Sequence, residues 1–194
     1  MIRAAGTGCL IAALSACAGS AAAQIAELHM GAVGSVGAGS AYGPGAGLLV
    51  GLSAGRLTYA GVRWASYTGR TSTDGTVRVR TRTQTFSADV GVVLPLGGME
   101  LMPGISLGAL RFAQRHGAAG DTTGALTSLT GHAVEFLVSP GLALEIHAGG
   151  SFAFIPEIQW SLAGHPDLPF RAFHRGLVAT IRLVTVTEIG RVRR

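Results

Sequence analysis

The feature that most constrains the fold of this chain is an alternation of apolar and polar residues, repeated in one segment after another between clusters of Gly, Pro, Ser, Thr and Asp. In the segment 132–145, for example, Val134 and Phe136 fall on one parity, whereas Glu135 and Ser139 fall on the other. A period of two is typical of a β-strand whose two faces meet different surroundings. The pattern therefore predicts an all-β fold in which one face of each strand is apolar.

Eight such segments follow one another, each close to the roughly ten residues that a tilted strand needs to cross a bilayer. The expected strands are 26–36, 46–54, 57–67, 82–95, 99–111, 132–145, 151–161 and 172–187. The gaps alternate in length: the long ones are 37–45, 68–81, 112–131 and 162–171, and the short ones are 55–56, 96–98 and 147–150. Long loops at one end and tight turns at the other are the layout of membrane barrels. We therefore predict an eight-stranded antiparallel up-and-down transmembrane β-barrel over residues 24–190, followed by a basic tail at 191–194.

The distribution of charge also favours lipid around this barrel. Only 13% of residues are charged, roughly half the share of an ordinary soluble domain, and the mean hydropathy is +0.43. On the predicted parity, charged residues in the middle of strands face inward, and the outward cations Arg111 and Arg175 lie at strand ends, where exposure to lipid costs little. A soluble sandwich or lipocalin-like barrel has the same period of two, but its polar face meets water. Here the polar parity is rich in Gly and poor in charge, which favours the membrane barrel.

Two other classes of protein are disfavoured by the sequence. A membrane-spanning helix is not expected, because the longest apolar stretch, 90–110, contains Pro95, Pro103 and several glycines. The pI of about 10.2 suggests nucleic acid as a partner. However, the chain has neither a basic helix nor a basic motif interleaved with aromatic residues, so no nucleic-acid partner is expected.

The first residues have the pattern of a targeting segment. Arg3 precedes an apolar stretch at 4–14, and Ala21 to Ala23 offer a small-residue cleavage site, which predicts a signal peptide over residues 1–23. The stretch Leu14 to Cys17 also matches a bacterial lipobox, and this alternative would make the chain a lipid-anchored soluble β-domain through Cys17. Both cysteines lie in this segment, so no disulfide is expected in the body of the protein.

The inward charges predict a packed lumen rather than a reactive one. An eight-stranded barrel is just wide enough for side chains to fill it. Arg63 and Asp89 lie symmetrically about one loop, and Glu157 and Arg182 about another, so we expect two structural ion pairs in the lumen. Glu100 and Glu145 are also expected to approach each other near the short turns, as a structural pair. No catalytic residue, metal site or cofactor is predicted, because the six histidines show no metal-binding spacing.

The strand pattern, parity, loop alternation and signal of residues 25–187 resemble those of the eight-stranded outer-membrane barrels of the OmpA transmembrane domain and OmpX type. The resemblance implies a protein of the bacterial outer membrane that is inserted by the barrel-assembly machinery, and we expect a monomer. The chain departs from these families at its end, which is rich in Arg instead of closing on an aromatic residue. It also lacks the His-x-Ser arrangement of lipid A deacylases, because the nearest match reads His174-Arg175-Gly176.

The long loops carry most of the remaining information. The strands 57–67 and 82–95 are expected to extend beyond the membrane as a twisted hairpin through Val77 to Thr85. Seven arginines are expected at the long-loop end of the barrel, namely Arg70, Arg78, Arg80, Arg82, Arg115, Arg171 and Arg175. Such a rim is suited to lipopolysaccharide phosphates, although a solvated loop surface is an equal alternative. Aromatic residues expected at the same end, as an interfacial girdle, are Trp64, Tyr67, Phe112, Trp160, Phe170 and Phe173.

Two classes of function follow from these observations. The first is a non-enzymatic structural or surface-interaction barrel in outer-membrane lipid, whose loops contact lipopolysaccharide or an external partner. The second is a barrel enzyme acting on lipid, or a minor channel for small solutes.

Overall fold

The structure is a computed structural model that describes residues 26–38, 41–54, 57–74, 77–118, 128–149, 151–164 and 175–189. The predicted signal peptide and the basic tail lie outside these residues. No helix in the described ranges is long and apolar enough to cross a bilayer.

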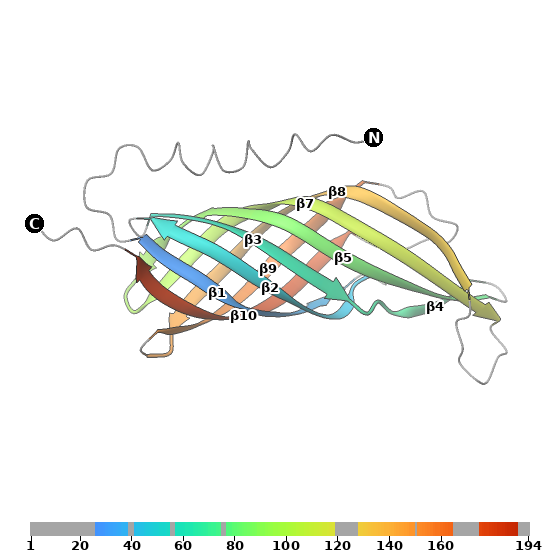
Figure 1. The fold of residues 1–194 in the computed structure, drawn as a ribbon, viewed down its shortest axis with the longest axis horizontal. Coiled ribbons are helices and arrows are strands. Elements are labelled where there is room, and N and C mark those ends of the chain that lie inside the picture. The colour runs from blue at the N-terminus through green and yellow to red at the C-terminus, as the bar shows by residue number, and fades with distance from the viewer. Residues whose placement is uncertain are drawn as a thin grey trace, which may run out of the picture.

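Eight strands form a closed antiparallel barrel (Figure 1). The eight strands of the barrel wall, which we call staves, are β1 (Ala26–Gly37), β2 (Gly43–Ala54), β3 (Thr58–Tyr67), β5 (Val77–Val92), β7 (Met99–Ala118), β8 (Ser128–His147), β9 (Phe152–Ala163) and β10 (Gly176–Ile189). Each stave pairs with the next along the chain, and β1 pairs with β10 from Ala26 opposite Ile189 to Gly37 opposite Val178, which closes the barrel. Two short strands add to it: β4 (Thr71–Asp74) pairs with β5, and β6 (Leu94–Leu96) pairs with β7. The predicted eight-stranded up-and-down barrel is therefore confirmed.

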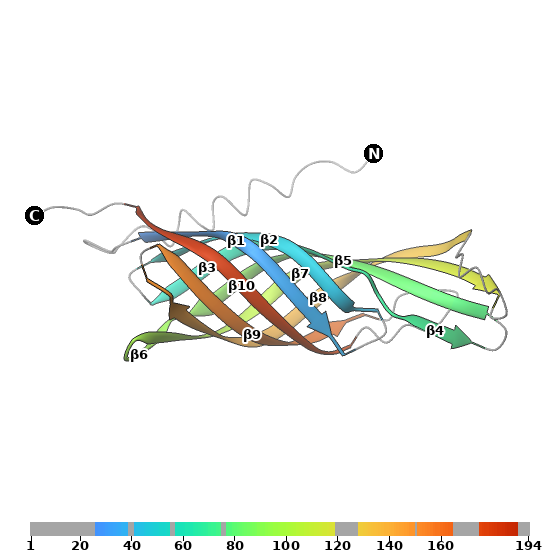
Figure 2. The same ribbon diagram turned by 90° about the horizontal axis from the view of Figure 1, so that it is seen from below.

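The connections alternate as predicted, and a hairpin through Val77 to Thr85 is present as β4 and the start of β5, but the continuation of β7 and β8 into the predicted loop 112–131 was not expected. β5 begins at Val77 instead of residue 82, β7 runs on to Ala118, and β8 begins at Ser128. Together with β4, these strands extend well past the rest of the barrel at the long-loop end (Figures 1 and 2). The physical reason is the sequence of 77–85, where Val and Thr alternate with Arg. β-Branched residues favour extended backbone and pack well across strands, so pairing continues where both faces are too polar for the bilayer.

One glycine allows β4 to leave the barrel wall and rejoin β5. Gly69 lies between β3 and β4 and has a φ of 68°, in the left-handed region that side chains disfavour. A Cβ at this position would also collide with the carbonyl oxygen of Thr81 on β5. Arg80 donates from Nε to the carbonyl oxygen of Thr68 at 3.0 Å, which holds the same corner against β5.

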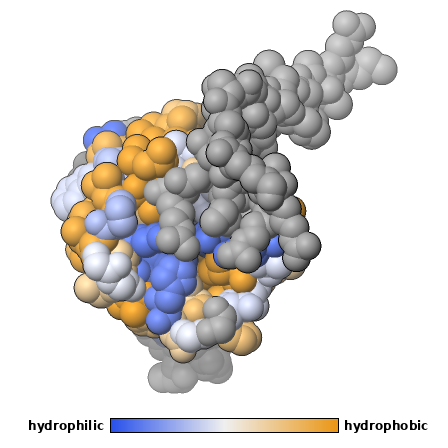
Figure 3. All heavy atoms as spheres, turned by 90° about the vertical axis from the view of Figure 1, so that its left-hand side faces the viewer, coloured by the Kyte–Doolittle hydropathy of each residue, from blue (hydrophilic) through white to orange (hydrophobic). Residues whose placement is uncertain are grey.

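The outer face of the barrel is apolar and the inner face is not. Large apolar side chains point outward on every stave; the most exposed include Leu48, Phe86, Val134, Phe136, Phe152 and Leu183. Viewed from the short-turn end, apolar residues surround a hydrophilic centre (Figure 3). A water-soluble barrel has the opposite arrangement, so this surface is suited to hydrocarbon.

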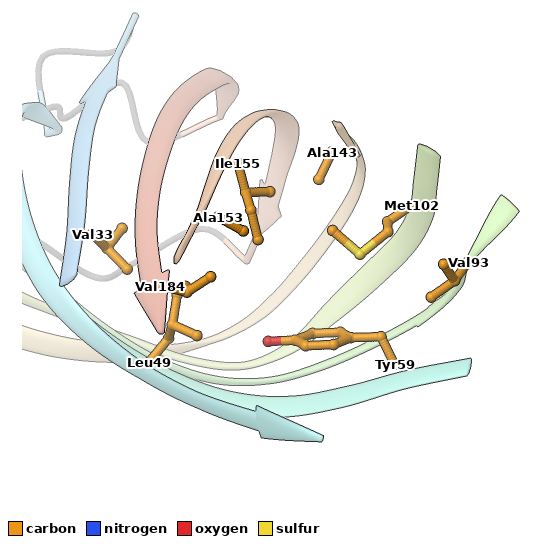
Figure 4. Packing of buried hydrophobic residues seen from close by; sticks show 9 residues of the cluster. All are labelled: Val33, Leu49, Tyr59, Val93, Met102, Ala143, Ala153, Ile155 and Val184. Carbon is orange, nitrogen blue, oxygen red and sulfur yellow. The ribbon is translucent and has the colours of Figure 1, made fainter. Parts of the chain in front are cut away.

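Two buried apolar clusters fill the lumen on either side of a polar layer. The cluster toward the short turns includes Tyr59, Met102, Ile155 and Val184, whose side chains converge inside the barrel wall (Figure 4). The cluster toward the long loops is built around Tyr42, Tyr67, Leu110, Phe112 and Leu137.

The aromatic residues expected in an interfacial girdle fall into two groups. Trp64 and Trp160 point outward, as predicted, but Tyr67 and Phe112 are buried inside the barrel. Their place in the girdle is therefore wrong, because each shares the inward parity of its strand: Tyr67 with Ala65, and Phe112 with Leu110. Phe170 and Phe173 lie outside the described residues.

Candidate functional site

Four charged side chains from four strands meet in the middle of the lumen. They are Arg63 on β3, Asp89 on β5, Glu157 on β9 and Arg182 on β10, and all four are buried. We call them the lumen quartet. Two pairs were expected here, Arg63 with Asp89 and Arg182 with Glu157. In the structure Arg63 Nη2 lies 2.9 Å from Asp89 Oδ2, and Arg182 binds Glu157 through both Nε and Nη2.

The quartet is a single network rather than two separate pairs. Arg63 Nη1 donates to Glu157 Oε2 at 2.6 Å, which links β3 to β9 across the lumen. Arg182 Nη2 also approaches Asp89 Oδ2 at 3.9 Å. Glu157 therefore accepts from both arginines. Two guanidinium groups and two carboxylates make the network neutral, which is the condition under which buried charges are tolerated.

Neutral polar groups form further hydrogen bonds with the quartet. Ser106 on β7 accepts from Arg63 Nη2 at 2.9 Å and from Gln159 Nε2 at 2.7 Å. Ser87 donates to Asp89 Oδ1 at 3.1 Å. On the short-turn side, the guanidinium carbon of Arg182 lies 5.9 Å from the ring centroid of Tyr59. The polar layer is thus fixed by partners on several strands.

The space left beside the quartet is small. A cavity of about 20 Å³, lined in part by Tyr59, Asp89, Met102 and Ser106, lies between the polar layer and the short-turn cluster. This is room for about one water molecule. The described side chains therefore plug the barrel at this level.

A second polar group, which the sequence did not predict as a unit, lies near the short turns. It consists of Glu27 and His29 on β1, Ser53 on β2, and Glu145 and His147 on β8, and we call it the mouth cluster. Inward parity was the available signal, since each of these residues has it. What parity does not give is which strands face each other across the lumen. The expected approach of Glu100 to Glu145 corresponds to a direct cross-strand pairing of β7 with β8.

The arginines of the predicted rim divide into two groups in the structure. Arg78, Arg80 and Arg82 on β5 and Arg115 on β7 lie on the outer face of the extension, with Arg80 directly opposite Arg115. Arg111 on β7 belongs to the same face, since it is exposed and diagonal to Arg82, and its outward parity was the signal that should have included it. We call these five residues the arginine ribbon. Apart from Asp74, whose side chain is outside the description, no described carboxylate is within ion-pair distance of any of them.

The other predicted rim residues do not join this ribbon. Arg70 is exposed in the corner between β3 and β4. Arg175 precedes β10 and donates from Nε to the carbonyl oxygen of Ala163 at 3.0 Å, which places it beside the end of β9 and away from β5 and β7. Arg171 lies outside the described residues, as does His174.

Comparison with known proteins shows the fold. No family model and no curated protein matches the sequence. The structure is similar to the N-terminal β-barrel domain of Pseudomonas aeruginosa OprF, with a TM-score of 0.53 and 13% identity over 83% of this chain and 97% of that one. It is also similar to a major outer membrane protein from Thermus thermophilus, with a TM-score of 0.54 and 13% identity over 84% of this chain and 99% of that one. The chain therefore has the fold of the small eight-stranded outer-membrane barrels.

Proposed function

We propose that this protein is a non-enzymatic barrel of the bacterial outer membrane, closed to solutes, whose arginine ribbon binds the phosphate groups of lipopolysaccharide. The membrane part of the proposal is supported by the apolar outer face and by the outer-membrane origin of the two similar structures. In barrels of this kind the short turns are periplasmic. The extension that carries the ribbon then lies outside the cell, beside the outer leaflet.

The observation that carries the proposal is the spacing of arginines on one face of the paired strands β5 and β7, where no carboxylate with a described side chain forms an ion pair with them. Arg80 and Arg115 are directly opposed across β5 and β7, and Arg82 lies diagonal to both Arg111 and Arg115. Like charges opposite each other destabilise a sheet. A bound anion relieves this repulsion, and guanidinium groups bind phosphate through paired hydrogen bonds.

Removing charge from the ribbon is expected to weaken binding to lipopolysaccharide. An arginine near an anionic membrane surface contributes about 1 kcal/mol, so the triple variant Arg82→Ala, Arg111→Ala and Arg115→Ala should bind about a hundredfold more weakly. Calorimetric titration of the detergent-purified protein with lipopolysaccharide measures this difference.

Two controls separate the ribbon from general cationic character. Arg175→Ala removes an arginine from the same end but outside the ribbon, and it should leave the affinity close to that of the parent protein. Lipopolysaccharide with its phosphates removed should bind the parent protein no more tightly than intact lipopolysaccharide binds the triple variant. Equal affinity of parent and triple variant for intact lipopolysaccharide would refute the proposed role of the ribbon.

The closed lumen has its own expected result. Because the quartet and the two apolar clusters fill the interior, the protein reconstituted in a planar bilayer should show no stepwise conductance of the porin type. A porin inserted under the same conditions provides the positive control. Reproducible steps whose number rises with the amount of added protein would favour the alternative, a channel for small solutes.

A further inference from the structure

The mouth cluster has an arrangement that neither a closed lumen nor a lipopolysaccharide site requires. It lies at the short-turn end, where hydrophilic residues gather in the centre and apolar residues surround them (Figure 3). His29 and Glu145 are almost completely buried there, with side chains 2% and 1% exposed, whereas His147 is 42% exposed. The buried side chains of His29 and Glu145 thus lie next to His147, which solvent reaches.

A chain of hydrogen bonds determines which nitrogen of His29 carries its proton. The hydroxyl of Ser53 donates to Glu27 Oε2 at 3.1 Å. Its oxygen is 3.3 Å from His29 Nε2 and, having given its hydrogen to the carboxylate, accepts from that nitrogen. The proton of the neutral imidazole is therefore assigned to Nε2, and Nδ1 presents a bare lone pair.

This lone pair faces a carboxylate that is also an acceptor. His29 Nδ1 lies 4.0 Å from Glu145 Oε2, and Glu145 Oε1 lies 3.8 Å from His147 Nε2. Neither Glu145 oxygen nor His29 Nδ1 has a hydrogen-bond partner within the described residues, although all three are buried. Acceptors that face each other without a donor are costly in a lumen of low dielectric. The gap between them is suited to a cation.

We propose that the mouth cluster binds one divalent transition-metal ion of the Zn²⁺ class through His29 Nδ1, the Glu145 carboxylate and His147 Nε2. Imidazole nitrogen and carboxylate oxygen are the ligands of such ions, and two histidines with one carboxylate leave a fourth position for water. Magnesium and calcium favour all-oxygen sites and fit this ligand set poorly. Glu27 and Ser53 would hold the His29 ring in the ligating tautomer, a common arrangement behind a metal-bound histidine.

The proposed ligands are near one another but do not form a metal site in this structure. Within the described ranges, no group of three or more His, Cys, Asp or Glu side chains is placed so that it could hold a metal ion, so the proposed ligands have to move before they can bind one. Ligand atoms around tetrahedral zinc are about 3.3 Å apart, so each histidine nitrogen has to come closer to the Glu145 carboxylate than the present 4.0 and 3.8 Å. His147 is able to move, because it is the last residue of β8 and its side chain is partly exposed. Glu100 pairs with Glu145 across β7 and β8 and adds negative charge beside the site.

Cobalt titration of the full-length protein in detergent, after treatment with a chelator, tests the site directly. We expect one equivalent of Co²⁺ to bind with the visible absorption bands of a tetrahedral site, and Zn²⁺ to abolish these bands. His147→Ala and Glu145→Gln should each weaken binding at least tenfold. His132→Ala should bind as the parent protein does, since it removes a histidine near the opposite end of β8.

The outcomes separate the site from its alternatives. Absence of Co²⁺ absorption in the parent protein would overturn the proposal and leave a proton as the only cation between Glu145 and the histidines. Binding that survives both His147→Ala and Glu145→Gln would also overturn it, because the metal would then be held elsewhere. Heat-dependent gel migration shows whether each variant is folded, and His147→Ala removes a partly exposed side chain, so this variant is expected to fold. The proposed metal site rests on the barrel fold and does not depend on the arginine ribbon binding lipopolysaccharide.

Discussion

Glu157→Gln is expected to lower the free energy of unfolding by about 3–5 kcal/mol, the typical cost of breaking a buried ion pair by removing one partner. Glu157 is the carboxylate that accepts from both Arg63 and Arg182. The amide has almost the same shape, so the loss does not come from a cavity. It comes from two guanidinium groups that remain buried with Asp89 as their one remaining carboxylate in the quartet.

Urea unfolding of the protein reconstituted in lipid vesicles measures this loss, and the temperature at which gel migration changes gives a second reading. Glu188→Gln is the matched control, since it makes the same chemical change at an exposed position near the end of β10 and should have little effect. Adding Arg182→Met to Glu157→Gln leaves Arg63 paired with Asp89 and should recover part of the stability, as a double-mutant cycle would show. If Glu157→Gln unfolds at the same urea concentration as the parent protein, the neutral quartet does not stabilise the barrel.

The second large loss of stability is expected from a charged substitution on the outer face of the barrel. Ile158 is 54% exposed and lies near the centre of β9, which runs from Phe152 to Ala163. Arg at the midplane of a bilayer costs roughly 2–4 kcal/mol on the lipid face of a barrel. Ile158→Arg should therefore reduce the free energy of folding into vesicles by that amount.

The control is the same kind of substitution at a position nearer the edge of the bilayer. Phe152 is the first residue of β9 and is 62% exposed, so Phe152→Arg makes a comparable change at the short-turn edge of the apolar surface. The cost there should be about 0–1 kcal/mol. Equal losses for the two variants would mean that the outer face does not have hydrocarbon around it. Neither substitution alters the lumen or the ribbon, so the outcome tests the membrane part of the proposed function and is independent of the arginine ribbon and of the mouth cluster.

Much of the barrel was predictable because polarity alternates wherever lipid lies on one side of the wall. β2, β3 and β9 illustrate this, with ends that differ from the predicted ones by no more than three residues. The extension was harder to predict: the sequence indicated a hairpin through Val77 to Thr85 but not the pairing of this segment with β7. Over 77–85, Arg alternates with Thr and Val, and when neither face is strongly apolar the period of two is difficult to distinguish from a polar loop. The structure of this segment depends on its pairing with β7, and the sequence of the segment itself does not indicate this partner.

The same limit applies to the two polar sites. Arg63 and Asp89 lie on staves joined by one loop, so their proximity follows from counting residues on either side of it. The bond from Arg63 to Glu157 joins β3 to β9, which are not neighbours, and it depends on how the closed barrel is staggered. The mouth cluster likewise joins β1 and β2 to β8. Contacts across a lumen depend on the shear of the barrel, which strand periodicity alone does not give.

The pairing of β1 with β10 has a consequence for how the molecule is made. The two strands that seal the wall are the first and the last of the barrel, so the seam cannot form until the final stave has been synthesised. Until then, any partly assembled sheet has two edges of unpaired amide and carbonyl groups, which hydrocarbon does not solvate. Membrane entry and circular closure must therefore be coupled in time, or another protein must cover both edges while the chain is incomplete. Since contacts this distant in sequence form slowly, sealing of the seam is expected to limit the rate of biogenesis.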